Sequence, residues 1–192
     1  MHKQYLWTPW RMAYVSGKED EGAGSRGANE TAPEETGPMS EEASPKESTG
    51  CVFCDRVRLS PDHDRANLIL LRGERNFVIL NLYPYNSAHL IVVPYEHTAD
   101  FARLDRETVA EMMGLAQRML AAIKEEYAPE GFNLGMNLGR IAGAGVADHV
   151  HMHVVPRWGG DTNFMPVVGH TRVLPQLLAD TRSLLAAAWN EV

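Results

Sequence analysis

The sequence predicts an α+β fold, in which an antiparallel sheet packs against a long helix and a C-terminal helix. Two β-rich runs, residues 76–82 and 89–94, flank a segment rich in turn residues, which is the pattern of an antiparallel hairpin. Apolar residues recur at helical spacing through residues 105–127, and Asp105 is suited to cap the start of that helix. Hairpin-connected strands with a segregated helix are typical of the α+β class.

The remaining elements follow from local patterns. Residues 132–137 predict a strand, and a loop with several glycines follows at residues 139–147. Residues 149–156 predict a further strand, and a C-terminal helix is expected from about Leu174 to Trp189.

Composition divides the chain of 192 residues into three segments. Residues 1–16 are aromatic and apolar, which predicts an arm that packs on its own body or on a partner subunit. Residues 17–50 contain no aromatic residue and hold nine acidic side chains against three basic ones. Because such a segment cannot bury enough apolar surface to offset its ordering entropy, we expect an acidic flexible linker. Residues 51–192 then form the folded domain.

The distribution of charge limits the possible partners. The formal net charge is −7, and the linker contributes most of it, so the folded domain is close to neutral. A broad nucleic-acid surface would need clustered lysine and arginine, so we expect no nucleic-acid partner. The sequence has neither a signal-peptide pattern nor a run approaching the roughly 20 apolar residues of a membrane span. We therefore expect a cytoplasmic protein with no membrane association.

Three histidines alternate with apolar residues at His149, His151 and His153. On a strand they would share one face, with neighbours about 7 Å apart. Histidine is uncommon in strands, so the alternation favours a functional role, either chemical or as a row of metal ligands. A neutral imidazole is a good nucleophile toward phosphorus because its pKa is near 6.5.

This pattern resembles the motif of the histidine-triad (HIT) family, His-φ-His-φ-His-φ-φ with φ apolar. The run from Ser87 to Pro94 resembles the hairpin strand of that family. Three segments, LWTPWRMAYV, LNLYPYN and HVVPRWGGDTNF, look most like bacterial diadenosine-tetraphosphate phosphorylases, near the fragile-histidine-triad branch. The resemblance covers most of residues 51–192. It implies a HIT-like catalytic domain whose homodimer joins two sheets.

The resemblance also implies a reaction. His151 would attack an α-phosphate of a dinucleoside polyphosphate, such as diadenosine tri- or tetraphosphate, and form a covalent nucleotidyl-histidine. Phosphate or water would then accept the nucleotide. His89 and His153 would flank the phosphate and donate to its oxygens, whereas Asn81 would lie at the ribose and Asn137 near the phosphates. Two alternatives remain: a nucleoside phosphoramidate hydrolase, and a nucleotide-binding regulatory module with little turnover.

The loop before the histidines departs from the family pattern. Its backbone N–H groups can bind an anion, and we expect Gly145 and Val146 to line the nucleotide site. Relatives commonly carry Ser, Thr or Gln at these two positions, so this chain lacks the usual side-chain donor to the leaving group. The leaving group must then rely on backbone, water or substrate, and the sequence leaves the acceptor open.

Cys51 and Cys54 have the spacing of a zinc knuckle, but two thiolates make only half of a tetrahedral site. Some HIT proteins, and the related galactose phosphate uridylyltransferases, hold zinc with two cysteines, a histidine after the hairpin, and the first triad histidine. This resemblance implies a closed structural site of Cys51, Cys54, His97 and His149. Two free buried thiols beside a surface His97, or a redox pair, are the alternatives.

Four aromatic residues lie near predicted loops and could shape the base pocket or a dimer interface. They are Tyr83, Tyr85, Trp158 and Phe164.

Overall fold

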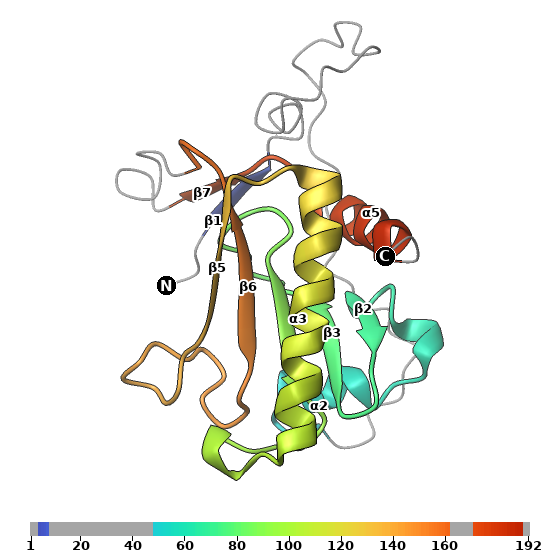
Figure 1. The fold of residues 1–192 in the computed structure, drawn as a ribbon, viewed down its shortest axis with the longest axis vertical. Coiled ribbons are helices and arrows are strands. Elements are labelled where there is room, and N and C mark those ends of the chain that lie inside the picture. The colour runs from blue at the N-terminus through green and yellow to red at the C-terminus, as the bar shows by residue number, and fades with distance from the viewer. Residues whose placement is uncertain (1–3, 8–47, 162–170, 190–192) are drawn as a thin grey trace, which may run out of the picture.

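The computed structural model describes residues 4–7, 48–161 and 171–189 (Figure 1). Five strands form an antiparallel sheet in the spatial order β2-β3-β4-β6-β5. Their bounds are Ile69–Arg72 for β2, Asn76–Leu80 for β3, Leu90–Pro94 for β4, Gly131–Met136 for β5 and Met152–Arg157 for β6. The predicted α+β class with an antiparallel sheet is therefore confirmed.

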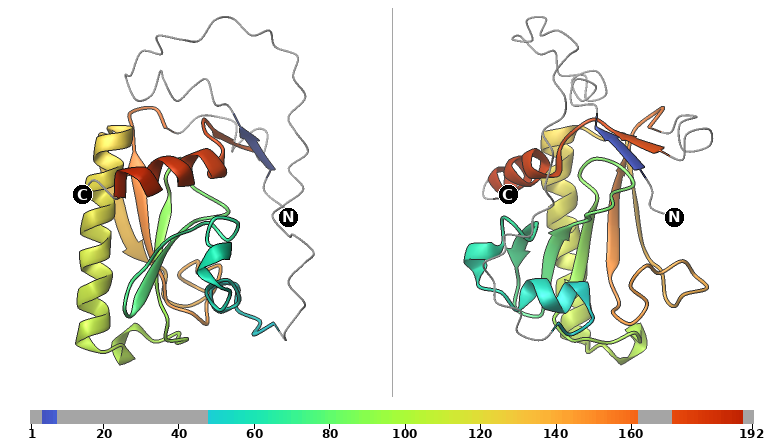
Figure 2. Two further views of the ribbon diagram at one scale, coloured as in Figure 1. Left: turned by 90° about the vertical axis from the view of Figure 1, so that its right-hand side faces the viewer. Right: turned by 180° about the vertical axis from the view of Figure 1, so that it is seen from behind.

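One face of the sheet is covered by α3 (Arg106–Tyr127), with α5 (Leu178–Trp189) packed beside it (Figures 1 and 2). The helix α3 begins as predicted, because the Asp105 carboxylate accepts a hydrogen bond from the Thr108 backbone N–H at 2.7 Å. All five residues of β3 and of β4 are buried, which makes this hairpin the centre of the core. The opposite face of the sheet carries the triad histidines and α2 (Val52–Val57).

Two predicted starts, of the last strand of the sheet and of the C-terminal helix, are wrong by three residues or more. The strand predicted over residues 149–156 begins only at Met152, because the ladder of β6 on β4 runs from Val92↔Met152 to Leu90↔Val154. The preceding backbone is held differently, since Val150 N–H donates to the Thr98 carbonyl at 2.7 Å. His149 and His151 therefore lie just before the strand and do not continue its alternation.

The C-terminal helix begins at Leu178 and not near Leu174. Leu174 instead ends β7 (Thr171–Leu174), which pairs in parallel with β1 (Gln4–Trp7). Part of the predicted N-terminal arm thus pairs with the backbone of its own chain. The rest of that arm and nearly all of the predicted linker, residues 17–47, lie outside the described residues.

The short elements α2 and β2, and 3-10 turns at Pro61–His63 and Phe101–Arg103, had no sequence prediction. Among the helices of the described segments, none combines the length and apolar character needed to cross a membrane.

Candidate active site

His151 is buried and its tautomer is set by the backbone. Its Nδ1–H donates to the carbonyl of His149 at 2.8 Å, so Nε2 keeps the free lone pair. Burial lowers the pKa of His151, which favours the neutral imidazole. The Phe53 ring packs against both imidazoles, with centroid distances of 5.1 Å to His151 and 5.6 Å to His149. The side chain is thus held in the state that a nucleophile at phosphorus needs.

His153 and His89 form a hydrogen-bonded pair, with Nε2 of His89 2.9 Å from Nδ1 of His153. The backbone N–H of Tyr85 donates to Nδ1 of His89 at 3.0 Å, which leaves Nε2–H of His89 as the donor to His153. Nε2 of His153 therefore carries its proton. Burial, together with the nearby His151, lowers the pKa of His153 to about 4.

A cavity of about 540 Å³ opens beside His151 and His153. It brings together the four residues expected at the nucleotide: Asn81, Asn137, Gly145 and Val146. Its walls also include Tyr83 and Tyr85, so two of the four aromatic candidates line it. The volume lies in the range of about 300–1,000 Å³ that is typical of small-molecule sites.

His89 does not line this cavity and has no exposed surface. It lies behind His153, with its Nε2 2.9 Å from Nδ1 of that residue. Trp158 is buried away from the cavity, and its indole N–H donates to the Tyr127 carbonyl at 3.3 Å. The remaining aromatic candidate, Phe164, lies outside the described residues.

Arg56 of α2 also lines the cavity and had no sequence prediction. Its Nη1 donates to the Asn67 carbonyl at 3.3 Å, and burial lowers the pKa of the guanidinium. The helix α2 has only six residues, too few for a periodic pattern to reveal which side chains face the site. This arginine gives the cavity a cation that composition alone could not locate.

The predicted metal ligands form a compact cluster, in which the ligand atoms of Cys51, Cys54, His97 and His149 all lie within 4.8 Å of one another. Nδ1 of His149 is 3.3 Å from Cys51 Sγ, 3.6 Å from Cys54 Sγ and 3.3 Å from His97 Nδ1. Tetrahedral zinc with bonds of about 2.0–2.3 Å places neighbouring ligand atoms about 3.3–3.8 Å apart. The residues present therefore fit such an ion.

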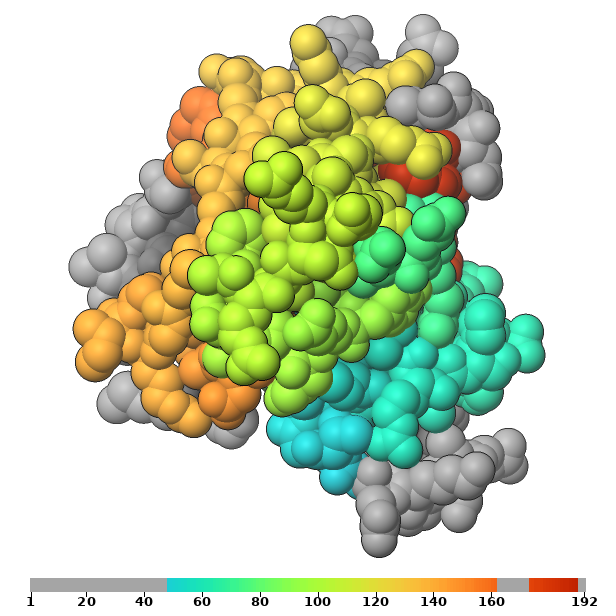
Figure 3. Space-filling view, turned by 60° about the horizontal axis from the view of Figure 1, so that its bottom comes forward, coloured from blue at the N-terminus to red at the C-terminus, as the bar shows by residue number. Residues whose placement is uncertain are grey.

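The tautomer of His149 also suits metal binding. Its Nε2–H donates to the Pro94 carbonyl at 2.9 Å, which leaves Nδ1 facing the sulfurs of Cys51 and Cys54. An outward hydrogen bond from the other ring nitrogen is a usual feature of metal-bound histidine. The contributing segments are the start of α2 with its N-cap Cys51, the residues after β4 and those before β6, and they lie at the end of the molecule that faces the viewer in Figure 3.

Comparison with known proteins gives consistent matches. A family model described as HIT domain matches residues 64–160. The AP-4-A phosphorylase of Mycobacterium tuberculosis is 42% identical over 97% of this chain and 84% of its own length. An adenosine 5'-monophosphoramidase of Schizosaccharomyces pombe is 33% identical over 56% of this chain and 74% of its own length.

A solved structure extends the match to the fold. The Zn-bound histidine triad family protein from Mycobacterium smegmatis has a TM-score of 0.60 and 32% sequence identity. The alignment covers 76% of this chain and 96% of that one.

Proposed function

This chain belongs to the histidine-triad (HIT) family, and from that membership we propose that it is a nucleotidyl transferase that cleaves dinucleoside polyphosphates at an α-phosphate. Diadenosine tetraphosphate is the substrate we favour, because the relative that matches 97% of the chain is an AP-4-A phosphorylase. The observation that carries the proposal is the fixed tautomer of His151, whose free Nε2 belongs to a side chain lining the cavity.

In the first step, the Nε2 lone pair of His151 attacks the α-phosphorus and forms an N–P bond. The bond from that phosphorus to the bridging oxygen breaks, and the oxygen leaves with the electron pair as part of ATP. In the second step, an oxygen of inorganic phosphate attacks the same phosphorus, the N–P bond breaks, and ADP departs. The neutral imidazole is regenerated, and the proton of the phosphate passes to solvent.

The surrounding groups stabilise the charge that develops on the phosphate. Because His89 fixes the proton of His153 on Nε2, His153 can donate to a phosphate oxygen. The Asn137 amide and the backbone around Gly145 line the same cavity and can donate as well. We assign Asn81 to the ribose, because it lines the cavity beside Leu82 and Tyr83.

The proposal is tested by incubating the protein with diadenosine tetraphosphate, with and without inorganic phosphate, and resolving the products. We expect ADP and ATP that form only when phosphate is present. AMP and ATP without phosphate would identify a hydrolase acting through the same His151. The variant His151→Ala should fold with an unchanged thermal midpoint and lose turnover, and full activity in that variant contradicts the mechanism.

Two other activities are separated by the same assay. The similarity to an adenosine 5'-monophosphoramidase supports a second candidate, phosphoramidate hydrolysis, and adenosine 5'-phosphoramidate should be included as a substrate. Tight binding of diadenosine tetraphosphate with no products from either compound would favour the nucleotide-binding regulatory module.

We further propose that Cys51, Cys54, His97 and His149 hold a structural zinc ion. Four protein ligands leave no open position, so the ion would tie the start of α2 to the segments after β4 and before β6. Its contribution to the site is to fix the backbone at His149, whose carbonyl orients His151.

A homodimer is proposed through β5, which is an edge strand of the five-stranded sheet. Its residues are half-buried or exposed, and Leu134 is 42% exposed. A second copy pairing along this edge would cover these groups and join two sheets. Analytical ultracentrifugation gives the test, and a monomer at micromolar concentration contradicts it.

A further inference from the structure

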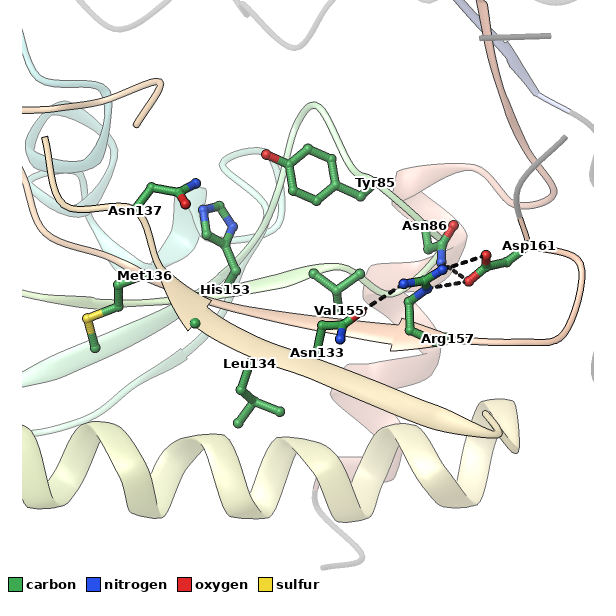
Figure 4. Close-up of a pocket in the computed structure, with 11 residues that line it drawn as sticks. Tyr85, Asn86, Asn133, Leu134, Met136, Asn137, His153, Val155, Arg157 and Asp161 are labelled. Atoms are coloured by element: carbon green, nitrogen blue, oxygen red, sulfur yellow. Dashed lines mark hydrogen bonds and ion pairs between the residues drawn. The ribbon is translucent and has the colours of Figure 1, made fainter. Parts of the chain in front are cut away.

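A second cavity adjoins the nucleotide cavity at His153, and Figure 4 shows the residues that line it. Its volume is about 360 Å³, and β5, β6 and the segment at Tyr85 and Asn86 form its walls. Tyr85, Asn137 and His153 line both cavities. The two cavities are therefore neighbours, and His153 lies between them.

We propose that this second cavity binds the second nucleoside of the dinucleoside polyphosphate, the one that departs with the leaving group. The inference rests on the proposed function, because it needs a substrate with a nucleoside at each end. A nucleotide whose α-phosphate is at His151 must extend its remaining phosphates out of the first cavity, and the shared wall at His153 leads into the second.

The charge of the second cavity suits a neutral group better than a phosphate. Among the described residues that line it, the cation is Arg157, which forms a two-pronged ion pair with Asp161, with Nε–Oδ2 and Nη2–Oδ1 distances of 2.5 and 2.9 Å. The Asn86 amide donates to the same carboxylate at 2.7 Å. Because Asp161 already neutralises the Arg157 guanidinium, this part of the second cavity would not retain an anion. The polyphosphate would therefore stay near His153.

The remaining polar groups match a base or a ribose. Nη1 of Arg157 donates to Oδ1 of Asn133 at 2.8 Å, which orients this amide and leaves its Nδ2 as a donor for a ligand. Asn137 offers a second amide at the opposite end of the cavity (Figure 4). The Tyr85 ring, 42% exposed, and the side chain of Val155 supply the flat and apolar surfaces against which a base can stack.

Gly135 keeps the floor of this cavity open. It pairs with His153 across the β5–β6 ladder, and a Cβ built there would meet no atom within 4 Å. A larger side chain at this position would therefore project into free space beside His153 without displacing protein atoms. Gly131, at the start of β5, lines neither cavity, and a Cβ built there would also meet no atom within 4 Å.

The test compares Gly135→Val with the wild type on diadenosine tetraphosphate and on adenosine 5'-tetraphosphate, which lacks the second nucleoside. We expect KM for diadenosine tetraphosphate to rise at least about 10-fold in the variant, with kcat/KM for adenosine 5'-tetraphosphate unchanged. The matched control is Gly131→Val, which adds the same side chain to the same strand outside both cavities and should leave both substrates unaffected.

An equal loss with both substrates would show that the valine only disturbs His153, and no loss with either would show that the cavity is not used. Both results overturn the second-nucleoside site and leave the proposed function standing. If the wild type cleaves neither compound, the proposed function fails. The second-nucleoside site is then tested by binding. The dissociation constants of both compounds are measured for His151→Ala and for the double variant His151→Ala, Gly135→Val. The second nucleoside should add affinity only in the variant that keeps Gly135.

Discussion

His89 sets the proton position of His153 without reaching the cavity itself. The backbone N–H of Tyr85 donates to Nδ1 of His89, and Nε2–H of His89 donates to Nδ1 of His153. Because a backbone N–H can only donate, Nδ1 of His89 must accept, and the ring proton of neutral His89 is on Nε2. His89 is therefore a positioning residue in this structure.

The variant His89→Ala should lower kcat by about 100-fold while changing KM little, because His153 loses the partner that fixes its ring and tautomer. The measurement is steady-state kinetics on diadenosine tetraphosphate together with the thermal midpoint. His89→Gln, whose amide can donate to His153, should recover part of kcat. Equal kcat for the alanine variant and the wild type would contradict this role.

Gly145→Ser adds a hydroxyl to the loop that lines the nucleotide cavity, at one of the two positions where the family resemblance implies a side-chain donor. A Cβ at Gly145 would meet no atom within 4 Å and the backbone there has no positive φ, so serine should be accommodated. One added donor near the leaving oxygen should raise kcat by about 10-fold. Ala144→Ser is the control, because Ala144 does not line the cavity and its hydroxyl should change nothing. An unchanged kcat in Gly145→Ser would show that the backbone already supplies the required donor.

Asp161 should make stability depend on pH. Hydrogen bonds from Arg157 are the largest cause that lowers the pKa of this carboxyl. Because the folded-state pKa is below the unfolded value of about 3.9, the contribution to stability is present above that pH and is lost as the pH falls below it. Asp161→Asn should lower the free energy of unfolding by about 2 kcal/mol at pH 7 and by less at about pH 3, which is below the unfolded-state pKa.

Urea unfolding at the two pH values measures this difference. Asp148→Asn is the control, because Asp148 and Arg140 are 3.8 Å apart with side chains 77% and 81% exposed, and such pairs contribute little. A similar destabilisation by Asp161→Asn at both pH values would argue against the ionic role of the carboxylate.

Zinc analysis of the purified protein should find about one ion per chain. His97→Ala should lose the ion and lower the thermal midpoint, because three ligands and a solvent molecule hold zinc less tightly than a closed site. The exposed His63 provides the control variant His63→Ala, which should retain zinc. A wild-type preparation that is free of zinc and equally stable with a chelator would remove the metal assignment.

The elements that the sequence predicted well are those with a long or self-contained pattern. The helix α3 shows its apolar period over 22 residues and carries its own cap at Asp105. The hairpin of β3 and β4 pairs neighbours in sequence, so its two runs and their turn could be recognised together. The metal-ligand set could be predicted only from the family resemblance. The structure places the ligand atoms of Cys51, Cys54, His97 and His149 in one cluster.

The elements that escaped prediction depend on distant partners. The parallel pairing that makes Leu174 a strand residue joins segments far apart in sequence, and no local pattern reveals it. The start of β6 was misjudged because alternation continues through His149, whereas the ladder does not. The role of His89 behind His153, and the place of Arg56 in the cavity, depend on three-dimensional packing that residue types alone do not specify.

The ladder between β1 and β7 has a consequence for the order of folding. Residue 4 pairs with residue 171, so nearly the whole chain must be closed into one loop before the first of these hydrogen bonds can form. Closing such a loop costs chain entropy. The four-residue ladder can offset this cost only when the rest of the domain is already folded and holds the two segments close together. We therefore expect β1 to dock last and to detach first, with the amide protons of Gln4–Trp7 exchanging with solvent long before those of β3 and β4.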